Sequence, residues 1–377
     1  MGFQVFDLVS DPTDPERFYI GVADEGIFRT DDGGTNWTNV TSGDAGTSGF
    51  FQVVDENGLS QNNIEMAVAN NGRIYAALIA DGQPLYIGFS DSLGGAWTSM
   101  DLPQTDEVNG PAGISPRPKT GGQGNIHFSI VADPNDPFTV YVAGDRQDGD
   151  WSFQSGNSIG ARDAVGKLFR GDTREASIGN VLDPTGFVPF NGYSPQWEHL
   201  THSNTVAEMP GGGTRRGSAP HADSREMAFD ARGQLIEVDD GGIYRRTSPQ
   251  TNQGDWYSLN GDLQITEFHD IAYDSNSNIL LGGSQDNSTL QQLSSNSKIW
   301  EGVELINQQI VGQVLRSAPG DGGDVAHRPH GRHPLRGEAR PRKTCIRSAG
   351  RFRHRSWTLG GGCARRPVGN VALERLR

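Results

Sequence analysis

The sequence has 377 residues, of which 34% are hydrophobic and 51 are glycine, and its mean hydropathy is −0.56. This turn-rich composition is typical of a fold built from many short strands. It excludes a membrane-spanning helix, because no apolar run is long enough, and the first residues lead into a predicted strand without a signal peptide.

Charge is distributed unevenly along the chain. The formal net charge is −14, but the segment from His327 to Arg377 holds 14 Lys and Arg against two acidic residues, so it carries +12 and the rest carries −26. The acidic body argues against a nucleic-acid groove there. Both cysteines, Cys345 and Cys363, lie in the basic segment, so the body has neither a disulfide nor a thiolate metal site.

The first repeat unit is a set of four short apolar strands. They are predicted over Gln4–Ser10, Phe18–Ala23, Gly26–Arg29 and Trp37–Thr41, with the turn Asp11-Pro-Thr-Asp-Pro15 after the first. Four antiparallel strands of this length make one propeller-type blade, which cannot bury its own apolar face and needs copies beside it.

The loop before the fourth strand reads Thr30-x-Asp32-x-Gly34-x-x-Trp37. The Asp32 side chain can accept hydrogen bonds from nearby turn amides, Gly34 can take a positive φ, and Trp37 can pack back beneath the loop. Its role is predicted to be structural.

The second unit repeats this pattern with one change. Its strands are predicted over Ile64–Ala69, Arg73–Ile79 and Leu85–Ser90, and its loop reads Ser90-x-Ser92-x-Gly94-x-x-Trp97. Ser92 stands where the first loop has Asp, and its hydroxyl accepts a turn hydrogen bond more weakly.

Three further units follow after a polar connection near residues 102–124. The third unit, from Ile126, repeats the turn as Asp133-Pro-Asn-Asp-Pro137 and is interrupted by two insertions, Asp145–Val165 and Thr173–Gln196. Insertions within a compact repeat are more often functional than idle. The fourth unit runs from Arg225 to its Trp256-led strand, and the fifth from Phe268 to Val303. No helical periodicity of any length is visible.

Two sets of motifs carry a family resemblance. The Thr30–Trp37 loop resembles the Asp-box (BNR) hairpin of β-propellers. The segments His221-Ala-Asp223, Asp239-Asp-Gly-Gly-Ile-Tyr244, Phe268-His-Asp-Ile-Ala-Tyr-Asp274 and Gly282-Gly-Ser-Gln-Asp-Asn287 are similar to successive blade motifs of sortilin (VPS10)-like and xyloglucanase-like propellers. The resemblance covers roughly residues 4–303 and implies an all-β fold, but this fold carries many functions.

We therefore predict a β-propeller of four-stranded antiparallel blades, with five recognisable blades and a sixth broken off. The propeller occupies residues 1–318, with blades near 3–42, 62–101, 125–201, 222–260 and 265–304. Residues 319–377 begin a sixth blade at Gly320 and then become an aberrant basic tail. We interpret the change as a shift of reading frame, and the alternative is a genuine disordered tail.

Polar residues near strand ends are the candidate ligand-binding set: His221, Asp239, Asp240, His269, Asp270, Asp286 and Asn287. Strand-end loops of adjacent blades form the ligand face of a propeller, where such groups could bind sugar hydroxyls or a cation, or act as a general acid and base. The alternative is that these side chains tie down turn backbones.

The resemblance also bears on catalysis. Xyloglucanase-like enzymes use two Asp residues on different blades, and the nearest matches here are Asp239, Asp240 and Asp24 in the equivalent first-blade hairpin. The arginine triad and early Arg motif of sialidases are not found, so that activity is not expected.

Aromatic residues of the two insertions are a further candidate set: Trp151, Phe153, Phe187, Phe190 and Tyr193. Exposed rings can stack on sugars or contact a protein, and the alternative is that they cap a small core of the insertion itself.

The functional prediction is an extracellular or cell-surface binding module of a larger protein, with a carbohydrate or protein ligand on the loop face. The alternative is a glycoside hydrolase that acts on a β-glucan-type polysaccharide with two Asp residues as general acid and base. No nucleic-acid partner and no cofactor are predicted. Calcium is the one ion with a partial pattern, Asp274-x-Asn276-x-Asn278, but Ile279 replaces its Gly, so we expect a hairpin turn.

Overall fold

The computed structural model describes residues 4–44, 46–107, 110–114, 122–146, 166–201, 219–263, 265–284 and 288–302. It divides into two compact units, Met1–Ile265 and Thr266–Arg377, and each is described here by itself. The predicted sixth blade and basic tail, the first insertion beyond residue 146, and the candidates Trp151, Phe153, Asp286 and Asn287 lie outside the described residues.

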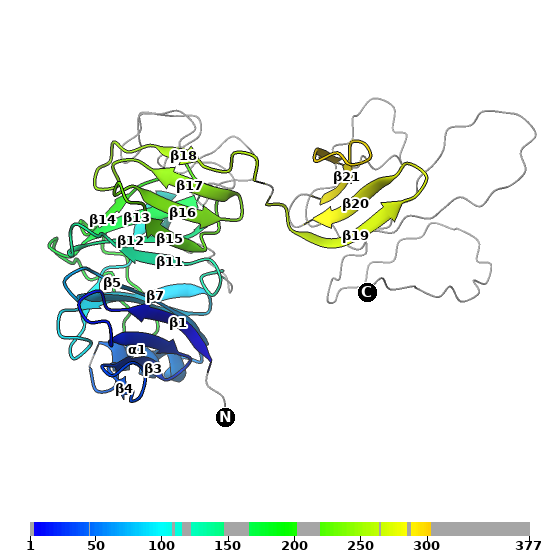
Figure 1. Ribbon diagram of the computed structural model, residues 1–377. Coiled ribbons are helices and arrows are strands. Elements are labelled where there is room, and N and C mark those ends of the chain that lie inside the picture. Colours follow the sequence, from blue (N-terminus) through cyan, green and yellow to red (C-terminus); the bar gives the residue numbers. More distant parts are fainter. Residues whose placement is uncertain are drawn as a thin grey trace, which may run out of the picture. The chain divides into compact units, whose positions relative to one another are not determined.

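The first unit contains four blades, which follow one another in chain order (Figure 1). Each is a four-stranded antiparallel sheet whose strands are neighbours in sequence order. The first two blades consist of β1 (Val5–Ser10), β2 (Phe18–Val22), β3 (Gly26–Thr30), β4 (Thr38–Asn39), then β5 (Gln61–Val68), β6 (Ile74–Ala80), β7 (Gln83–Ser90) and β8 (Thr98–Met100). The next two consist of β11 (Ser129–Ala132), β12 (Thr139–Arg146), β13 (Gly166–Asp172), β14 (Trp197–His199), then β15 (Glu226–Phe229), β16 (Leu235–Asp239), β17 (Gly242–Arg246) and β18 (Trp256–Ser258).

The second unit holds the fifth blade. Its four antiparallel strands are β19 (Phe268–Asp274), β20 (Ile279–Ser284), β21 (Ser288–Gln292) and β22 (Trp300–Gly302). The predicted fold class is thereby confirmed: the described residues are all-β apart from the helix α1, and they form five four-stranded antiparallel propeller blades.

The core of the first unit lies between consecutive blades. Strand β6 shows why its sequence is continuously apolar, since all seven residues are buried. Its alternate side chains face opposite ways, so Tyr75, Ala77 and Ile79 join the core with blade three, whereas Ile74, Ala76 and Leu78 join the core with blade one. A third core, which includes Tyr141 and Leu235, joins blades three and four.

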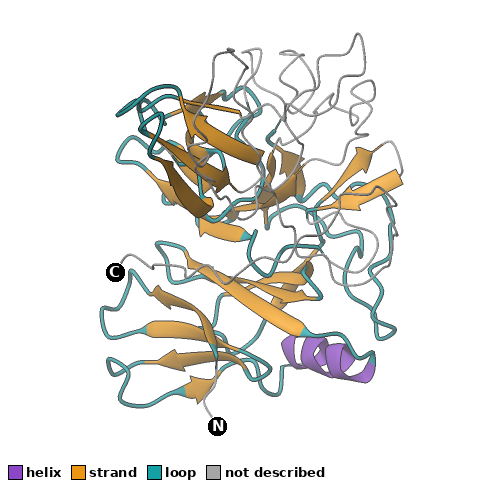
Figure 2. Ribbon diagram, turned by 90° about the vertical axis from the view of Figure 1, so that its right-hand side faces the viewer, coloured by secondary structure: helices purple, strands orange, loops and turns teal. Residues whose placement is uncertain are grey.

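The helix α1 (Thr47–Glu56) corrects the expectation of a chain without helices. Figure 2 shows it beside the sheets and not within one. Its Gly- and Ser-rich start concealed it, but Asp44 Oδ1 accepts hydrogen bonds from the Gly46 and Thr47 amides, and Phe50 and Val54, one helical turn apart, are both 2% exposed. Packing on the blades therefore stabilises a helix too short to persist alone.

The polar connection near residues 102–124 is also partly regular. It contains a two-stranded hairpin, β9 (Gln104–Glu107) and β10 (Gly110–Gly113), where we expected an irregular loop. Within the described residues, no helix is both long and apolar enough to span a bilayer.

Candidate functional site

The candidate site forms where strand ends of blades three and four meet. In an antiparallel blade, the first strand begins at the edge where the second strand ends. Strands β11 and β15 lie beside one another, so the residues before them share one edge with the last residues of β12 and β16. We call the polar residues there the edge cluster: His127, Asp145, His221, Asp223, Arg225, Glu237, Asp239 and Asp240.

His127 is the centre of the edge cluster. Its Nδ1 lies 3.2 Å from Oδ1 of Asp145 and 3.3 Å from Oδ1 of Asp223. Burial alone would lower the pKa of His127, but these two carboxylates outweigh burial and raise it to about 9. His127 is therefore an imidazolium at neutral pH, held by one carboxylate of its own blade and one of the next.

Two carboxylates face outward from this centre. Asp223 has a φ of 71°, in the left-handed region, and burial alone would raise its pKa, but His127 and other nearby positive charges lower it. Asp240 is exposed, and its Oδ1 accepts a hydrogen bond of 2.8 Å from Arg225 Nη2. Each of these carboxylates is thus braced by a cation, Asp223 by His127 and Asp240 by Arg225.

A second pair of carboxyl groups lies on β16. Glu237 and Asp239 are two residues apart and so lie on the same face of the strand. Glu237 is fully buried, and the Asp239 and Ser224 side chains are its polar neighbours. Burial, with Asp239 beside it, raises the pKa of Glu237 well above its usual value and so favours the protonated form.

Asp239 is less buried than Glu237. Burial also raises its pKa, while neighbouring groups, including His221, oppose the rise. Its Oδ1 accepts a hydrogen bond of 2.7 Å from the Gly241 amide. His221 packs closely against Gly241, where an added Cβ would lie 2.4 Å from the His221 Cβ. The edge cluster therefore combines carboxyl groups with raised pKa values, Glu237 and Asp239, and one with a lowered pKa, Asp223.

One group of described residues could hold a metal ion: His127, Asp223 and Asp240 each offer a ligand atom, and these atoms lie within 4.8 Å of one another. Imidazole with carboxylates suits a transition ion better than calcium, which takes oxygen ligands only. The fit is poor, because the raised pKa of His127 opposes the loss of the proton that a metal ligand must give up.

The structure brings together three of the sequence-predicted residues: His221, Asp239 and Asp240. Asp24 lies in the equivalent turn of blade one, where its amide donates to Gln61 Oε1, and none of its described contacts reaches the edge cluster. His269 and Asp270 lie on β19 of the second unit, where Asp270 Oδ1 accepts the Ile271 amide.

Sequence reasoning missed the most buried members of the cluster: His127, Asp145 and Glu237. It also passed over Asp223 and Arg225. A signal existed for Asp223, which ends the motif His221-Ala-Asp223 that had drawn attention to His221. No comparable local signal marked His127, because its partner Asp145 lies on a different strand.

The second insertion presents exposed rings. Phe187, Phe190 and Tyr193 are 62%, 43% and 48% exposed, and the rings of Phe190 and Tyr193 meet edge to face with centroids 5.2 Å apart. Exposure at this level favours the contact-platform interpretation over a core for the insertion.

Asp101, another residue that the sequence did not single out, anchors this insertion. Its carboxylate is fully buried and accepts hydrogen bonds of 2.7–2.9 Å from the amides of Ile178, Gly179 and Asn180. The Ser177 and Ser194 hydroxyls also donate to it, at 2.7 and 2.6 Å. The aromatic residues therefore project from a loop with a fixed base.

The Asp-box-like loops lie in the turns before β4 and β8. In the first, Gly34 has a φ of 92°, the Asn36 amide donates to Asp32 Oδ1 at 2.8 Å, and Thr30 Oγ1 also donates to Asp32 at 2.7 Å. Trp37 Nε1 donates to Gly34 O at 3.1 Å, although the Trp37 residue remains 37% exposed.

The second loop has the same turn hydrogen bonds, but its Trp differs. The Ala96 amide donates to Ser92 Oγ at 2.8 Å, and the Gly94 amide donates to Ser90 Oγ at 3.0 Å. Trp97 is 8% exposed, and its Nε1 donates to Val40 O of the preceding blade at 3.1 Å.

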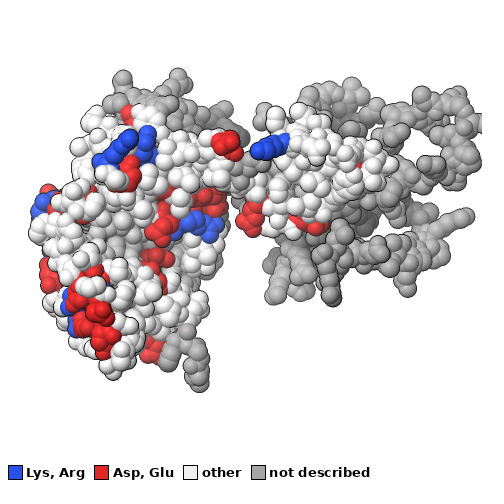
Figure 3. All heavy atoms as spheres, in the orientation of Figure 1, with Lys and Arg blue, Asp and Glu red and all other residues white. Residues whose placement is uncertain are grey.

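Acidic side chains occur in several groups on the face of the first unit that Figure 3 shows, with fewer basic ones beside them. This distribution agrees with the negative charge of the chain before His327. It disfavours a polyanionic ligand on this face.

Among solved structures, the chain is similar to the GH74 xyloglucanase from Xanthomonas campestris, with 14% identity, a TM-score of 0.43, and coverage of 85% of this chain and 45% of that one. For the GH74 enzyme from Niastella koreensis, the identity is 12% and the TM-score is 0.39, with coverage of 85% of this chain and 44% of that one. For PorZ, a surface component of the type-IX secretion system of Porphyromonas gingivalis, the identity is 17% and the TM-score is 0.37, with coverage of 78% of this chain and 33% of that one.

These similarities concern the fold alone, and the chain spans less than half the length of each of these structures. No protein-family model matches the sequence, and no curated protein is detectably similar to it.

Proposed function

We propose that this chain is an extracellular or cell-surface propeller module that binds a glycan at the edge cluster. The observation that carries the proposal is how the neighbouring cations contact the carboxylates of Asp223 and Asp240. Within the described residues, cations bind only Oδ1 of each carboxylate, which leaves each Oδ2 to accept a hydrogen bond from a ligand. Sugar hydroxyls are suitable donors, because hydrogen bonds to ionised acceptors are the stronger kind.

Pre-organisation supports this assignment. His127 and Arg225 hold the two carboxylates in place before any ligand arrives, so little side-chain freedom is lost on binding. The exposed rings of Phe190 and Tyr193 on the anchored insertion offer a separate surface for sugar stacking. A protein ligand is the competing outcome, and it would be recognised through a peptide rather than a polysaccharide.

The test is a glycan-array screen followed by calorimetry on the full chain and on Asp223→Asn and Asp240→Asn. Each substitution keeps the shape but removes the charge, and we expect about tenfold weaker binding of the glycan identified. Asp262→Asn is the matched control, because Asp262 is exposed in the same unit and lies outside the edge cluster. Unchanged affinity in both cluster variants, or binding of peptides alone, would refute the proposal.

A second candidate function is glycoside hydrolysis, which one observation favours. Within the edge cluster, the pKa values of Glu237 and Asp239 are raised, whereas the pKa of Asp223 is lowered. Carboxyl groups whose pKa values diverge in this way can serve as the acid and the base of one reaction. Asp239 would act as the acid, since Glu237 is fully buried and cannot touch substrate.

Polysaccharide hydrolysis by the full chain, measured as release of reducing ends from β-glucans, tests this alternative. An active wild type that loses activity in Asp239→Asn but keeps its melting temperature would establish the enzyme. Absence of cleavage across a broad set of glucans would remove it and leave the binding proposal intact.

A further inference from the structure

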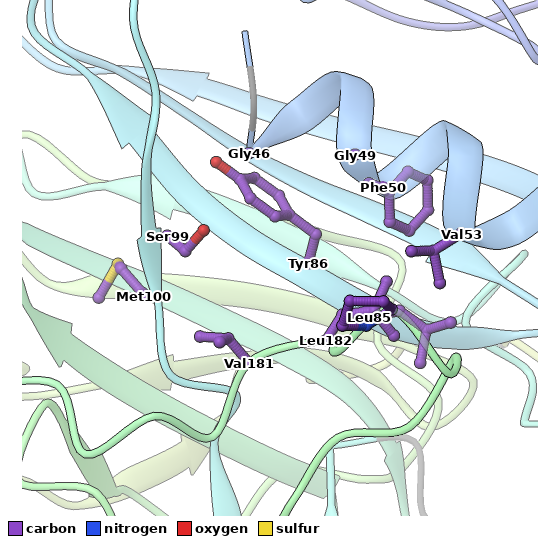
Figure 4. Close-up of a pocket in the computed structure, with 11 residues that line it drawn as sticks. Gly46, Gly49, Phe50, Val53, Leu85, Tyr86, Ser99, Met100, Val181 and Leu182 are labelled. Atoms are coloured by element: carbon purple, nitrogen blue, oxygen red, sulfur yellow. The ribbon is translucent and has the colours of Figure 1, made fainter.

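A pocket of about 200 Å³ lies between α1, the strands β7 and β8, and the second insertion (Figure 4). Its lining is mainly apolar and includes Phe50, Leu85 and Met100. The Tyr86 hydroxyl in its wall is hydrogen-bonded to the Ser99 side chain, so this polar pair is satisfied without a ligand. The turn that carries Asp240 at the edge cluster is more informative about binding.

This turn, between β16 and β17, is held by one side chain from outside it. Asn260, two residues after β18 ends, accepts a hydrogen bond of 2.8 Å from the Ile243 amide at Oδ1 and donates one of 2.8 Å from Nδ2 to Gly241 O. The two contacts bracket Gly242, which has a φ of 128° that favours glycine. An added Cβ on Gly242 would lie 2.0 Å from Asn260 Oδ1. We call this arrangement the Asn260 clamp.

The Asn260 clamp reaches Asp240 through Gly241. The Gly241 amide donates to Asp239 Oδ1 at 2.7 Å, while the Gly241 carbonyl oxygen accepts from Asn260 Nδ2. Both peptide groups of Gly241 are thereby fixed, and the first of them joins it to Asp240. The direction in which the Asp240 side chain leaves the turn is therefore set before its carboxylate meets Arg225, at 2.8 Å.

Blade one holds its equivalent turn, which carries Asp24, with two residues instead of one. The Ile27 amide donates to Thr41 Oγ1 at 3.1 Å, and Asn39 Nδ2 donates to Glu25 O at 2.7 Å. The two bonds made by the Asn260 amide group are thus divided in blade one between a hydroxyl and a separate side-chain amide.

The strand register fixes the correspondence between the two blades. The Val40 amide donates to Ile27 O at 2.8 Å in blade one, and the Leu259 amide donates to Ile243 O at 2.7 Å in blade four. The residues that follow Val40 and Leu259 therefore occupy equivalent positions. By the same register, Ser258 stands where blade one has the asparagine that reaches the turn carbonyl.

We propose that Asn260 is a positioning residue of the glycan site, which holds the Asp240 carboxylate in the orientation that receives a sugar hydroxyl. This role rests on the proposed glycan binding, whereas the hold of Asn260 on the Asp240 turn does not. Because blade four places both bonds on one side chain, a single substitution releases the whole turn.

The two ways of building the clamp supply matched variants. Asn260→Ala removes both bonds, and Asn260→Asp is a milder change that keeps the acceptor for Ile243 but loses the donor to Gly241. Asn39→Ala is the control, because it removes the equivalent bond in blade one, away from the edge cluster. The double variant Ser258→Asn with Asn260→Thr rebuilds the blade-one pair in blade four.

The first measurement is the reactivity of the Asp240 carboxylate in the full chain. Carbodiimide and glycine ethyl ester label exposed carboxylates, and mass spectrometry quantifies the label at Asp240, with thermal unfolding of each variant as a check on folding. We expect several-fold faster labelling in Asn260→Ala and Asn260→Asp, because the released turn lets Asp240 leave Arg225. Asn39→Ala should lower the melting temperature without changing Asp240 labelling, and the double variant should return it toward the wild-type rate.

The second measurement is calorimetry with the glycan selected by the array screen. Asn260→Ala should bind it about tenfold more weakly than wild type. The double variant should recover most of this loss, and Asn39→Ala should bind as wild type does. Recovery by the rebuilt pair would show that the bonds to the turn matter, and not asparagine itself.

Three results would overturn the proposal. Wild-type labelling of Asp240 in folded Asn260→Ala and Asn260→Asp would show that the clamp does not position this carboxylate. Equal effects of Asn39→Ala and Asn260→Ala would assign the change to stability alone. Faster labelling with unchanged glycan affinity would remove Asn260 from the binding site while leaving the glycan function intact. If the wild type binds no glycan, the proposed function fails instead, and the labelling still decides whether Asn260 holds Asp240.

Discussion

Nδ1 of His127 lies 3.2 Å from Oδ1 of Asp145, and both side chains are only 4% exposed. The two residues come from β12 and the segment before β11, within one blade, while Asp223 from the next blade approaches the same nitrogen. A single buried imidazolium therefore links blades three and four at the edge that carries the candidate site. The charge of His127 must then affect folding, and we expect it to affect binding at the proposed site.

Replacement of His127 by Gln should change how stability depends on pH. The folded pKa of about 9 exceeds the ordinary value of 6.5, so the contribution of His127 is fully present below pH 6.5 and is lost as pH rises through 9. We expect wild type to lose about 2 kcal/mol more than His127→Gln between these values. Urea unfolding of both proteins at pH 6 and pH 9.5 measures this difference, and parallel losses would contradict the assignment.

Replacement of Glu237 by Gln should stabilise the protein at neutral and alkaline pH. The folded pKa of Glu237 is raised above 4.5, so wild-type stability falls as pH rises from that value through the folded pKa. Gln keeps the shape and cannot ionise. We expect melting temperatures of Glu237→Gln and wild type to be similar near pH 4 and to diverge by several degrees at pH 8, with the variant higher. A lower melting temperature for the variant at pH 8 would show that the ionised carboxylate is needed.

Replacement of Asp101 by Asn should loosen the second insertion while the blades remain folded. An amide has one acceptor oxygen instead of two, so several of the hydrogen bonds from residues 177–180 and Ser194 are lost, at about 1 kcal/mol or more each. Hydrogen exchange followed by mass spectrometry should show faster exchange in residues 177–194. Asp183→Asn serves as the control, because Asp183 bonds only within its own turn. Equal exchange in the two variants would refute the anchoring role.

Replacement of Ser92 by Asp should stabilise blade two by about 0.5–1 kcal/mol. In the first loop, Asp32 uses both carboxylate oxygens, because Asn36 donates to it from its amide and from its side chain. Ser92 has one oxygen for the Ala96 amide. Guanidinium unfolding compares the variant with Asp32→Ser, which should lose a similar amount. A destabilised Ser92→Asp variant would show that the second loop is adapted to serine.

The sequence indicated the strands well because their signals are local. The apolar run Arg73–Ile79 was predicted as a strand and is found as β6, Ile74–Ala80. Turn residues such as Gly34, with its positive φ, marked where strands reverse. Each of these features depends on a residue and its near neighbours, so a single sequence contains them.

The helix α1 and the anchoring of the second insertion could not be predicted in this way. Ten residues are too few for a stable isolated helix, and α1 forms because Phe50 and Val54 find an apolar surface on the blades. Asp101 gained its role from a loop more than seventy residues later in the chain. Neither partner can be identified without knowing which blades lie side by side.

The candidate site divides along the same line. By itself, the sequence determined the all-β blade order and the polar strand ends, including Asp239 and Asp240, because both follow from local alternation and turn chemistry. Only the tertiary structure decided that His127 and Asp145 meet Asp223, and that Glu237 is fully buried beside Asp239. These facts arise from the packing of one blade on the next, which brings together groups that are far apart in sequence. That packing fixes the distances between the groups and how far each is removed from water, and these two factors set the pKa of each group.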